Sequence, residues 1–448
     1  MIDRVAGVGR PPASILVFWG VALLTMIFGH YQISGRLNLP YKGLTILVCL
    51  LAPLSPGFLS LFRKRQILYL IVFEAVLILG CLAGYTGSPS DLLSVGSQPV
   101  IFLRVFPFLL CGYTLALHPR FERLYLSALL TAFALLTLPD AILLFRGTTS
   151  GIVRERFLIE AYDQASAQAL VAAMVNVSVL GLLLALAGVR LYDYRHKMGR
   201  FVVAIPQAIL ASLSVTAGFT AAFVLLAWCT VVGILVAPAR TLQFRFLLLL
   251  TLTIVAPASL YALQLAAGQT GGSLAKISRR IEGLRNIVVG QDGDDVNEAT
   301  SGRSALAARS MASFARSPLI GLGRGRAVSE KGGDTETIGG HSFLLDSLGQ
   351  RGLLGTLPLI MALVSLARVP WQCMRREPSW RASASLTFVL TWVVAITINP
   401  YFLGYLALNS VVFLWFGFIL GDGQRVAIDK SIASGVQRFT VQSLRAAG

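Results

Sequence analysis

Residues 339–367, GGHSFLLDSLGQRGLLGTLPLIMALVSLA, pass from a polar, glycine-led start into an apolar run. The run from 345 to 367 is long enough for an α-helix to cross the roughly 30 Å of hydrocarbon in a bilayer. Backbone groups in lipid must be satisfied within their own segment, so such a run predicts a helix and not a strand. The stretch therefore predicts a transmembrane helix whose entry carries a histidine, His341.

The whole chain has the composition of a membrane protein. Of its 448 residues 55% are hydrophobic and only 13% are charged, and the mean hydropathy is +0.73. One water-soluble core cannot hold that many apolar side chains. We therefore predict an all-α, polytopic integral membrane protein with about 12 transmembrane helices. The expected spans are 14–32, 43–62, 67–85, 99–117, 124–145, 165–189, 201–214, 217–237, 246–267, 345–367, 383–399 and 401–421.

The basic residues predict the orientation, because short loops rich in Lys and Arg stay in the cytoplasm. Basic clusters such as RKR at 63–65 and RLYDYRHKMGR at 190–200 occupy alternate loops, whereas the loop at 84–98 has no Lys or Arg. Both termini are basic and are expected in the cytoplasm. These loops also explain the net charge of +17, so nucleic acid is not an expected partner. The expected organisation is 1–267 (transmembrane helices one to nine), 268–344 (a large outer loop), 345–421 (helices ten to twelve) and 422–448 (a cytoplasmic tail).

Neither the cysteines nor the carboxylates predict a metal site. Four of the five cysteines fall within expected spans, and no metal-ligand spacing is present. Asp292, Asp294 and Asp295 crowd a glycine-containing turn but fit no calcium-loop pattern, so a solvated acidic turn is expected there. We predict no metal and no cofactor.

The long outer loop holds most of the polar chemistry. Apolar residues spaced by three and four predict an amphipathic helix over 274–287, suited to a membrane surface or to covering the transmembrane bundle. A second helix follows Thr300 or Ser301 and is stopped by Pro318. GLGRGR at 321–326 is too short and too polar for a dinucleotide-binding turn, but its flexible backbone suits a phosphate or a sugar.

Four short motifs occur in this loop and in the helix after it: SGR, SPLIGLGRG, GGHS and LGQRGLLG. Their order resembles the periplasmic loop and following helix of the bacterial O-antigen ligase and O-antigen polymerase superfamily. The match covers residues 301–355, and the span number and loop position extend it loosely to the whole chain. The matching positions are Gly302 and Arg303, Pro318 to Gly323, His341 and Ser342, and Gly352 to Gly355.

The resemblance implies a GT-C-like glycosyltransferase that works without a metal in the bacterial inner membrane. Such enzymes move a glycan from an undecaprenyl diphosphate carrier to an acceptor sugar, a glycan or glycolipid, at the periplasmic face. By this resemblance His341 activates the acceptor hydroxyl and Arg303 contacts the leaving diphosphate. The alternative is that His341 is only a polar helix-entry residue and that Arg303 only anchors lipid headgroups.

Further diphosphate-binding arginines are less clearly marked. Members of the superfamily often carry a Ser-Arg at the start of a mid-chain span, but the corresponding stretch, SLSVTAGFTAAF at 212–223, has no arginine. This departure weakens a clamp of two arginines. The candidates for the second position are Arg154, Arg156, Arg279 and Arg280.

The expected function is an O-antigen or exopolysaccharide polymerase, and two other functions are alternatives. A ligase differs only in using lipid A core sugar as acceptor, and the missing mid-chain arginine slightly favours a polymerase, with a chain-length regulator as a candidate partner. A flippase or transporter of lipid-linked sugars is a rival because Glu74, Arg104 and Asp140 fall within expected spans. We expect Arg104 to pair with Glu74 or Asp140, with a carrier-site role or a proton relay as the alternative.

Overall fold

The computed structural model describes residues 11–32, 38–83, 104–150, 179–191, 220–238, 303–323, 327–328, 335–336, 342–398 and 406–446. These residues are helical apart from turns and two strands of two residues each, so the predicted all-α class is confirmed for this part of the chain. The labelled helices are α2 (Ala13–Gln32), α3 (Asn38–Leu51), η1 (Ala52–Leu54), α4 (Phe58–Phe62), α5 (Arg65–Ala83), α7 (Pro119–Ser150), α11 (Thr220–Val236), α15 (Arg303–Arg316), α16 (Phe343–Arg376), α17 (Trp380–Ile398) and α18 (Leu406–Ala446). Further apolar helices are Arg104–Ala116 and Val179–Arg190, and the antiparallel strands are β1 (Ala327–Val328) and β2 (Thr335–Glu336).

Three of the described helices are long and apolar enough to cross a membrane: α16, α17 and the part of α18 from Asn409 to Ile428. The outer face of α16 is lined with exposed apolar side chains that recur at helical spacing, among them Leu353, Leu357, Ile360 and Val364. Soluble monomers rarely expose a continuous apolar face of this kind. These helices and this surface indicate a membrane-associated protein.

Several expected spans agree with the structure, and one does not. The spans expected at 14–32, 67–85 and 383–399 correspond to α2, α5 and α17. The single helix expected over 43–62 is wrong, because the chain breaks into α3, η1 and α4 at Pro53, Pro56 and Gly57, whose φ is 95°. The expected spans 201–214 and 246–267 and the amphipathic helix 274–287 lie outside the described residues.

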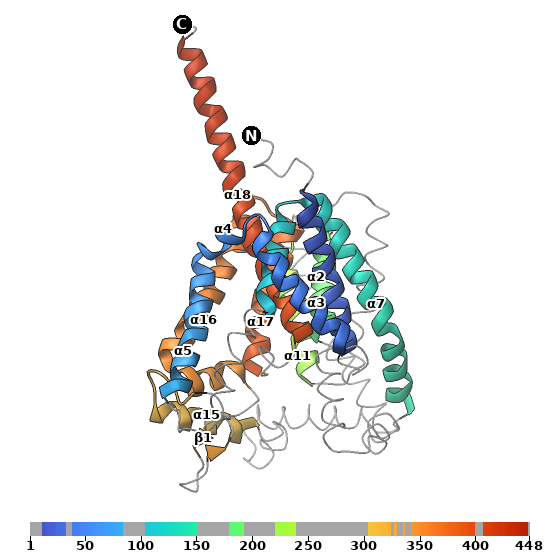
Figure 1. Cartoon of the computed structure of the whole chain (residues 1–448), viewed down its shortest axis with the longest axis vertical. Coiled ribbons are helices and arrows are strands. Elements are labelled where there is room, and N and C mark those ends of the chain that lie inside the picture. The colour runs from blue at the N-terminus through green and yellow to red at the C-terminus, as the bar shows by residue number, and fades with distance from the viewer. Residues whose placement is uncertain are drawn as a thin grey trace.

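The end of the last span also differs from the prediction. Residue 421 was expected to separate a span from a tail, but α18 continues as one helix from Leu406 to Ala446. Figure 1 shows its C-terminal part projecting from the body of the protein, at the end where α2 begins. α15 and β1 lie at the opposite end, and α5 and α16 run side by side between the two ends.

Glycines allow α18 to pack against helix 104–116 at backbone contact. A Cβ built on Gly112 would lie 2.0 Å from the Leu414 carbonyl oxygen, and one on Gly417 would lie 2.0 Å from that of Leu109. Small residues at an interface are what allow membrane helices to approach this closely. The rings of Phe388 and Trp415 stack beside this contact, with centroids 4.7 Å apart, so α17, α18 and helix 104–116 contribute to one buried core.

Candidate functional site

The structure describes only part of the predicted site. Arg303 is the first residue of α15, although its side chain is not among those described. His341 directly precedes Ser342, the N-cap of α16, and itself lies outside the described residues. The other candidates, Arg154, Arg156, Arg279 and Arg280, also lie outside the described residues.

The predicted second loop helix is confirmed. α15 runs from Arg303 to Arg316 and ends before Pro318, the residue expected to stop it. A turn over 318–323 follows, and this turn packs against α16. The segment resembling Pro-Leu-x-Gly-x-Gly is therefore a turn directly attached to the end of α15.

The turn and α16 interlock at a kink in the helix. Gly352 has φ 59° and ψ −163°, which breaks the helical path. The backbone groups around this kink pair with the turn instead of only with their own helix. Four hydrogen bonds join the two segments: Leu322 N to Gly349 O (2.9 Å), Gly323 N to Gln350 O (2.9 Å), Leu353 N to Pro318 O (2.8 Å) and Leu354 N to Leu319 O (3.0 Å).

Two glycines of the motifs are required by this interlock. Gly321 has φ 71°, and a Cβ on it would lie 2.2 Å from the carbonyl carbon of Gln350. A Cβ on Gly352 would lie 2.4 Å from the carbonyl carbon of Leu319. Both positions therefore need the left-handed backbone and the empty space that glycine alone provides. The contact between the two motifs therefore explains why glycine occupies these positions.

α15 and the first half of α16 also contact each other through side chains. The hydroxyl of Ser310 donates to the carboxylate of Asp346 at 2.8 Å, and both residues are buried. Further along, Leu353 of α16 pairs with Pro318. α15 is thus joined to the start of α16 at Ser310 and Asp346, and the turn after α15 is joined to the kink.

A buried arginine that the sequence analysis did not single out lies just before the kink. The side chain of Arg351 is 0% exposed, and its Cζ lies 4.0 Å from the ring centroid of Phe73 in α5. The ring of Phe343 lies 5.8 Å from the same Cζ, and a carboxylate oxygen of Glu74 lies 3.9 Å from Nη2. Glu74 thus has Arg351 beside it, an arginine other than the predicted Arg104, and the side chain of Asp140 is not described.

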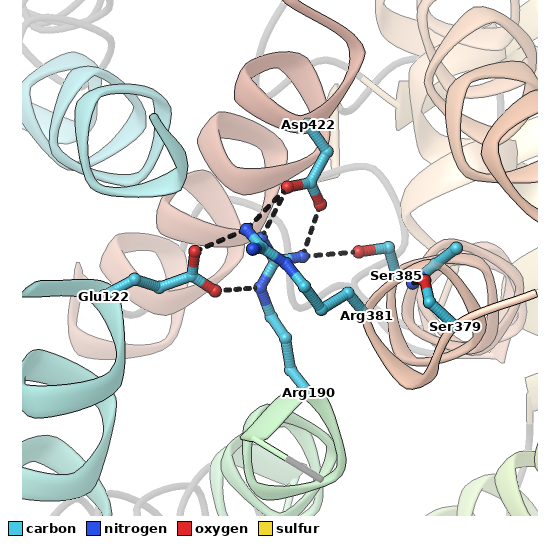
Figure 2. Close-up of polar contacts among 7 residues, drawn as sticks. Glu122, Arg190, Ser379, Arg381, Ser385 and Asp422 are labelled. Carbon is cyan, nitrogen blue, oxygen red and sulfur yellow. Dashed lines mark hydrogen bonds and ion pairs between the residues drawn. The ribbon is translucent and has the colours of Figure 1, made fainter. Parts of the chain in front are cut away.

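A second buried cluster joins four helices (Figure 2). Arg190 lies between Glu122 of α7 and Asp422 of α18, with Nε 2.6 Å from Glu122 and Nη1 2.7 Å from Asp422. Arg381 of α17 bridges the same two carboxylates, at 2.6 Å and 2.9 Å. Ser385 accepts a further hydrogen bond from Arg190 at 3.0 Å. Two guanidinium groups face two carboxylates, so the charges within this cluster compensate one another.

This cluster gives a structural role to a residue of the basic loops. Arg190 belongs to the basic stretch 190–200, yet Arg190 and its partner Glu122 are both 0% exposed. The positive-inside rule uses the number of basic residues in a loop and takes no account of their burial. The signals for this cluster in the sequence were Glu122, a carboxylate among basic residues, and Asp422, the residue after the expected span 401–421.

A lysine also contacts α18 close to this cluster. Lys64, between α4 and α5, donates to the side-chain oxygen of Gln424 at 2.5 Å and lies 6.0 Å from the ring centroid of Tyr113. Burial lowers the pKa of the Lys64 ammonium group below its ordinary value. The start of the projecting part of α18 is therefore held by a polar contact as well as by the charge cluster.

No protein-family model and no curated protein matches this sequence. Within the described ranges, no group of three or more His, Cys, Asp or Glu side chains is placed to hold a metal ion. The resemblance of the four motifs thus stays a prediction, and the interlocked turn and kink are the feature on which a functional proposal can be built.

Proposed function

We propose that this protein is a membrane glycosyltransferase of the O-antigen ligase and polymerase type. It transfers a glycan from undecaprenyl diphosphate to an acceptor sugar. The observation that carries this proposal is the interlock between the turn at 318–323 and the kink at Gly352. The turn and the kink both belong to motifs that carry the resemblance. They are separated in the sequence, but they form one structural unit. Such an arrangement is expected if they build one site.

The proposed topology has twelve spans, cytoplasmic termini and a periplasmic loop at 268–344. The position of α15 supports this arrangement, because α15 lies at the end of the molecule opposite the start of α2 and the C-terminal part of α18 (Figure 1). A donor with a lipid anchor and a hydrophilic acceptor can meet only at the boundary between water and lipid. In this topology α15 and the entry of α16 lie at that boundary on the periplasmic side.

The proposed reaction needs a base and fixed positive charge. The acceptor hydroxyl oxygen forms a bond to the anomeric carbon of the donor glycan, and the bond from that carbon to the diphosphate oxygen breaks. His341 takes the hydroxyl proton, and Arg303 stabilises the charge of the departing diphosphate. An arginine suits the second role because its planar, always charged fork pairs with phosphate oxygens.

The contact between α15 and the start of α16 supports cooperation between these two residues. Arg303 begins α15, and His341 comes two residues before the first residue of α16. The Ser310–Asp346 contact holds the two helices together a short distance further on. The N-terminus of a helix also favours negative charge, such as that of a diphosphate.

We propose a growing lipid-linked glycan as the acceptor, which makes the enzyme a polymerase. The stretch 212–223 lacks the mid-chain arginine often present in the superfamily, and this departure is the reason for the choice. In a polymerase the same chemistry is repeated at each added unit. A chain-length regulator would then be a partner in the membrane.

Replacing His341 in the native host tests the proposal. His341→Ala should abolish polysaccharide and cause lipid-linked repeat units to accumulate, because loss of a positioned general base costs about 10²- to 10⁴-fold in rate. The matched control is His196→Ala, in the basic loop after helix 179–190. Glycan gels, run beside immunoblots of membrane protein, give the result. Polymer at the normal level from normally inserted His341→Ala contradicts the proposal.

A further inference from the structure

We propose that Arg351 is a positioning residue, which holds the first half of α16 so that the segment before it presents His341 correctly. This inference rests on the proposed function. It assigns a role to a buried charged pair, Arg351 and Glu74, which the proposed chemistry does not use.

The guanidinium group of Arg351 connects the start of α16 to α5. Its Cζ lies 4.0 Å from the ring centroid of Phe73 and 5.8 Å from that of Phe343, and the two rings are 5.9 Å apart. A cation near the face of an aromatic ring is attracted by the ring's quadrupole, the more so when it is desolvated. Phe343 is the first residue of α16, so this group fixes the helix start to α5.

Glu74 supplies the charge that keeps Arg351 in this place. The carboxylate lies 3.9 Å from Nη2, on the residue next to Phe73 in α5. A charged group at membrane depth is costly and therefore pairs with an opposite charge. One turn of α5 thus provides both a ring and a counter-charge for the same guanidinium group.

The backbone around Arg351 is fixed independently. Gln350 O accepts from Gly323 N, and Leu353 N donates to Pro318 O, so the turn holds the chain on both sides of Arg351. A Cβ on Gly355 would lie 2.5 Å from the Cβ of Arg351, so glycine at this position leaves room for the arginine. Arg351 therefore extends from a rigid kink to the helix start, and movement of one is transmitted to the other.

Because Arg351 is buried, we do not expect it to bind the donor directly. Arg351 is 0% exposed, and its charge is already compensated by Glu74, whereas a diphosphate ligand needs an accessible cation. Arg351 thus acts on the reaction through the position of α16. The kinetic signature of such a residue is a lower kcat without a matching rise in KM.

The first test measures kcat and KM for purified protein in liposomes, using as donor the lipid-linked glycan extracted from a His341→Ala strain. Arg351→Met should lower kcat by about 10²-fold with little change in KM, since a misplacement of about 1 Å costs this much. Arg351→Lys should recover part of the loss. The matched control is Arg375→Met, because Arg375 is on the same helix and lies 5.2 Å from the ring centroid of Trp371.

Two results overturn the inference. A wild-type kcat for Arg351→Met shows that Arg351 has no role in the reaction, and a raised KM with unchanged kcat shows that it binds the donor. If Arg351→Met does not insert, Glu74→Gln and Arg351→Lys decide by the same measure. Each of these should lower kcat, and a normal kcat in both contradicts the proposal.

The second test separates this inference from the proposed function. In the double variant His341→Ala, Arg351→Met, the residual rate should equal that of His341→Ala alone, because the two residues act as one unit. Rates that fall by the product of the two single effects show an independent role and overturn the inference. If His341→Ala abolishes activity and Arg351→Met keeps the wild-type kcat, only the inference fails. Full activity in His341→Ala contradicts the proposed function itself.

Discussion

Leu353 donates its backbone N–H to the carbonyl of Pro318 at 2.8 Å, although one residue belongs to a kinked apolar helix and the other to a loop turn. The contact exists because Gly352 breaks the helical path and leaves the following amides to the turn. A loop segment and a helix entry are thereby built as one unit.

Adding a methyl group at the interlock should destabilise it. Gly352→Ala and Gly321→Ala each place a Cβ within about 2.5 Å of backbone atoms at positive φ, where non-glycine residues cost about 1–3 kcal/mol before any overlap. Both should lower the midpoint of thermal unfolding in detergent. Gly233→Ala in α11 is the control, because nothing lies within 4 Å of a Cβ there. Equal midpoints for all three variants contradict the described contact.

Removing one charge from the buried cluster should destabilise the helix bundle. Arg190→Met leaves Arg381 as the one guanidinium of the cluster for the two carboxylates of Glu122 and Asp422, and removing one partner of a buried pair costs about 3–5 kcal/mol. Arg120→Met is the control, since Arg120 is an exposed arginine at the start of α7. Fluorescence-detected size exclusion after heating measures both. A loss for Arg190→Met no larger than for Arg120→Met shows that the cluster is not stabilising.

Replacing Arg303 should reduce the amount of glycan product far more than replacing Arg309 or Arg316, the other arginines of α15. Arg303→Ala should abolish glycan extension, and Arg303→Lys should restore only part of it because the bidentate fork is lost. Arg309→Ala and Arg316→Ala, on another face of α15, should change product amounts much less. Glycan gels with quantified membrane protein compare the four variants. Similar losses at all three positions indicate a diffuse basic surface instead.

Replacing Asp140 should have different effects if the protein is a transporter and if it is a glycosyltransferase. Transporters commonly depend on ionisable residues within their spans, so Asp140→Asn should abolish function if the protein moves its substrate. We expect Asp140→Asn to retain polysaccharide synthesis and His341→Ala to lose it. Polysaccharide measured in the native host compares the two variants. The reverse result favours a transporter.

The proposed topology can be tested by cysteine labelling. In a cysteine-free variant, Ser273→Cys and Ser329→Cys should react with an impermeant thiol reagent in intact cells, since both lie in the loop expected outside. Ser431→Cys, an exposed position in the projecting part of α18, should react only after lysis. Labelling of Ser431→Cys in intact cells, or of the two loop positions only after lysis, contradicts the orientation.

Local patterns in the sequence were enough to predict several elements. Apolar runs predicted α2, α5 and α17, and an N-cap residue followed by a proline stop predicted α15. These predictions succeeded because the residues that determine each helix are close together in the chain. The kink in α16 was not predicted. Glycine in a helical pattern permits a positive φ but does not require one, and the turn at 318–323 is what makes Gly352 adopt it.

Long-range ion pairing was not predictable either. Arg104 was expected to pair with Glu74 or Asp140, and the structure adds Arg351, which the sequence did not single out, at 3.9 Å from Glu74. Arg190 was counted as a topological charge, although it is buried between Glu122 and Asp422. Which charges meet depends on how the helices pack, and hydropathy and charge counts do not contain this information.

The release of undecaprenyl diphosphate tests the central claim most directly. Purified protein in liposomes is given the lipid-linked glycan extracted from a His341→Ala strain, and both products are followed by mass spectrometry. A glycosyltransferase should release one undecaprenyl diphosphate for each glycosidic bond formed, and the His341→Ala protein should release almost none. Movement of intact lipid-linked glycan across the bilayer, without release of diphosphate, would contradict the account.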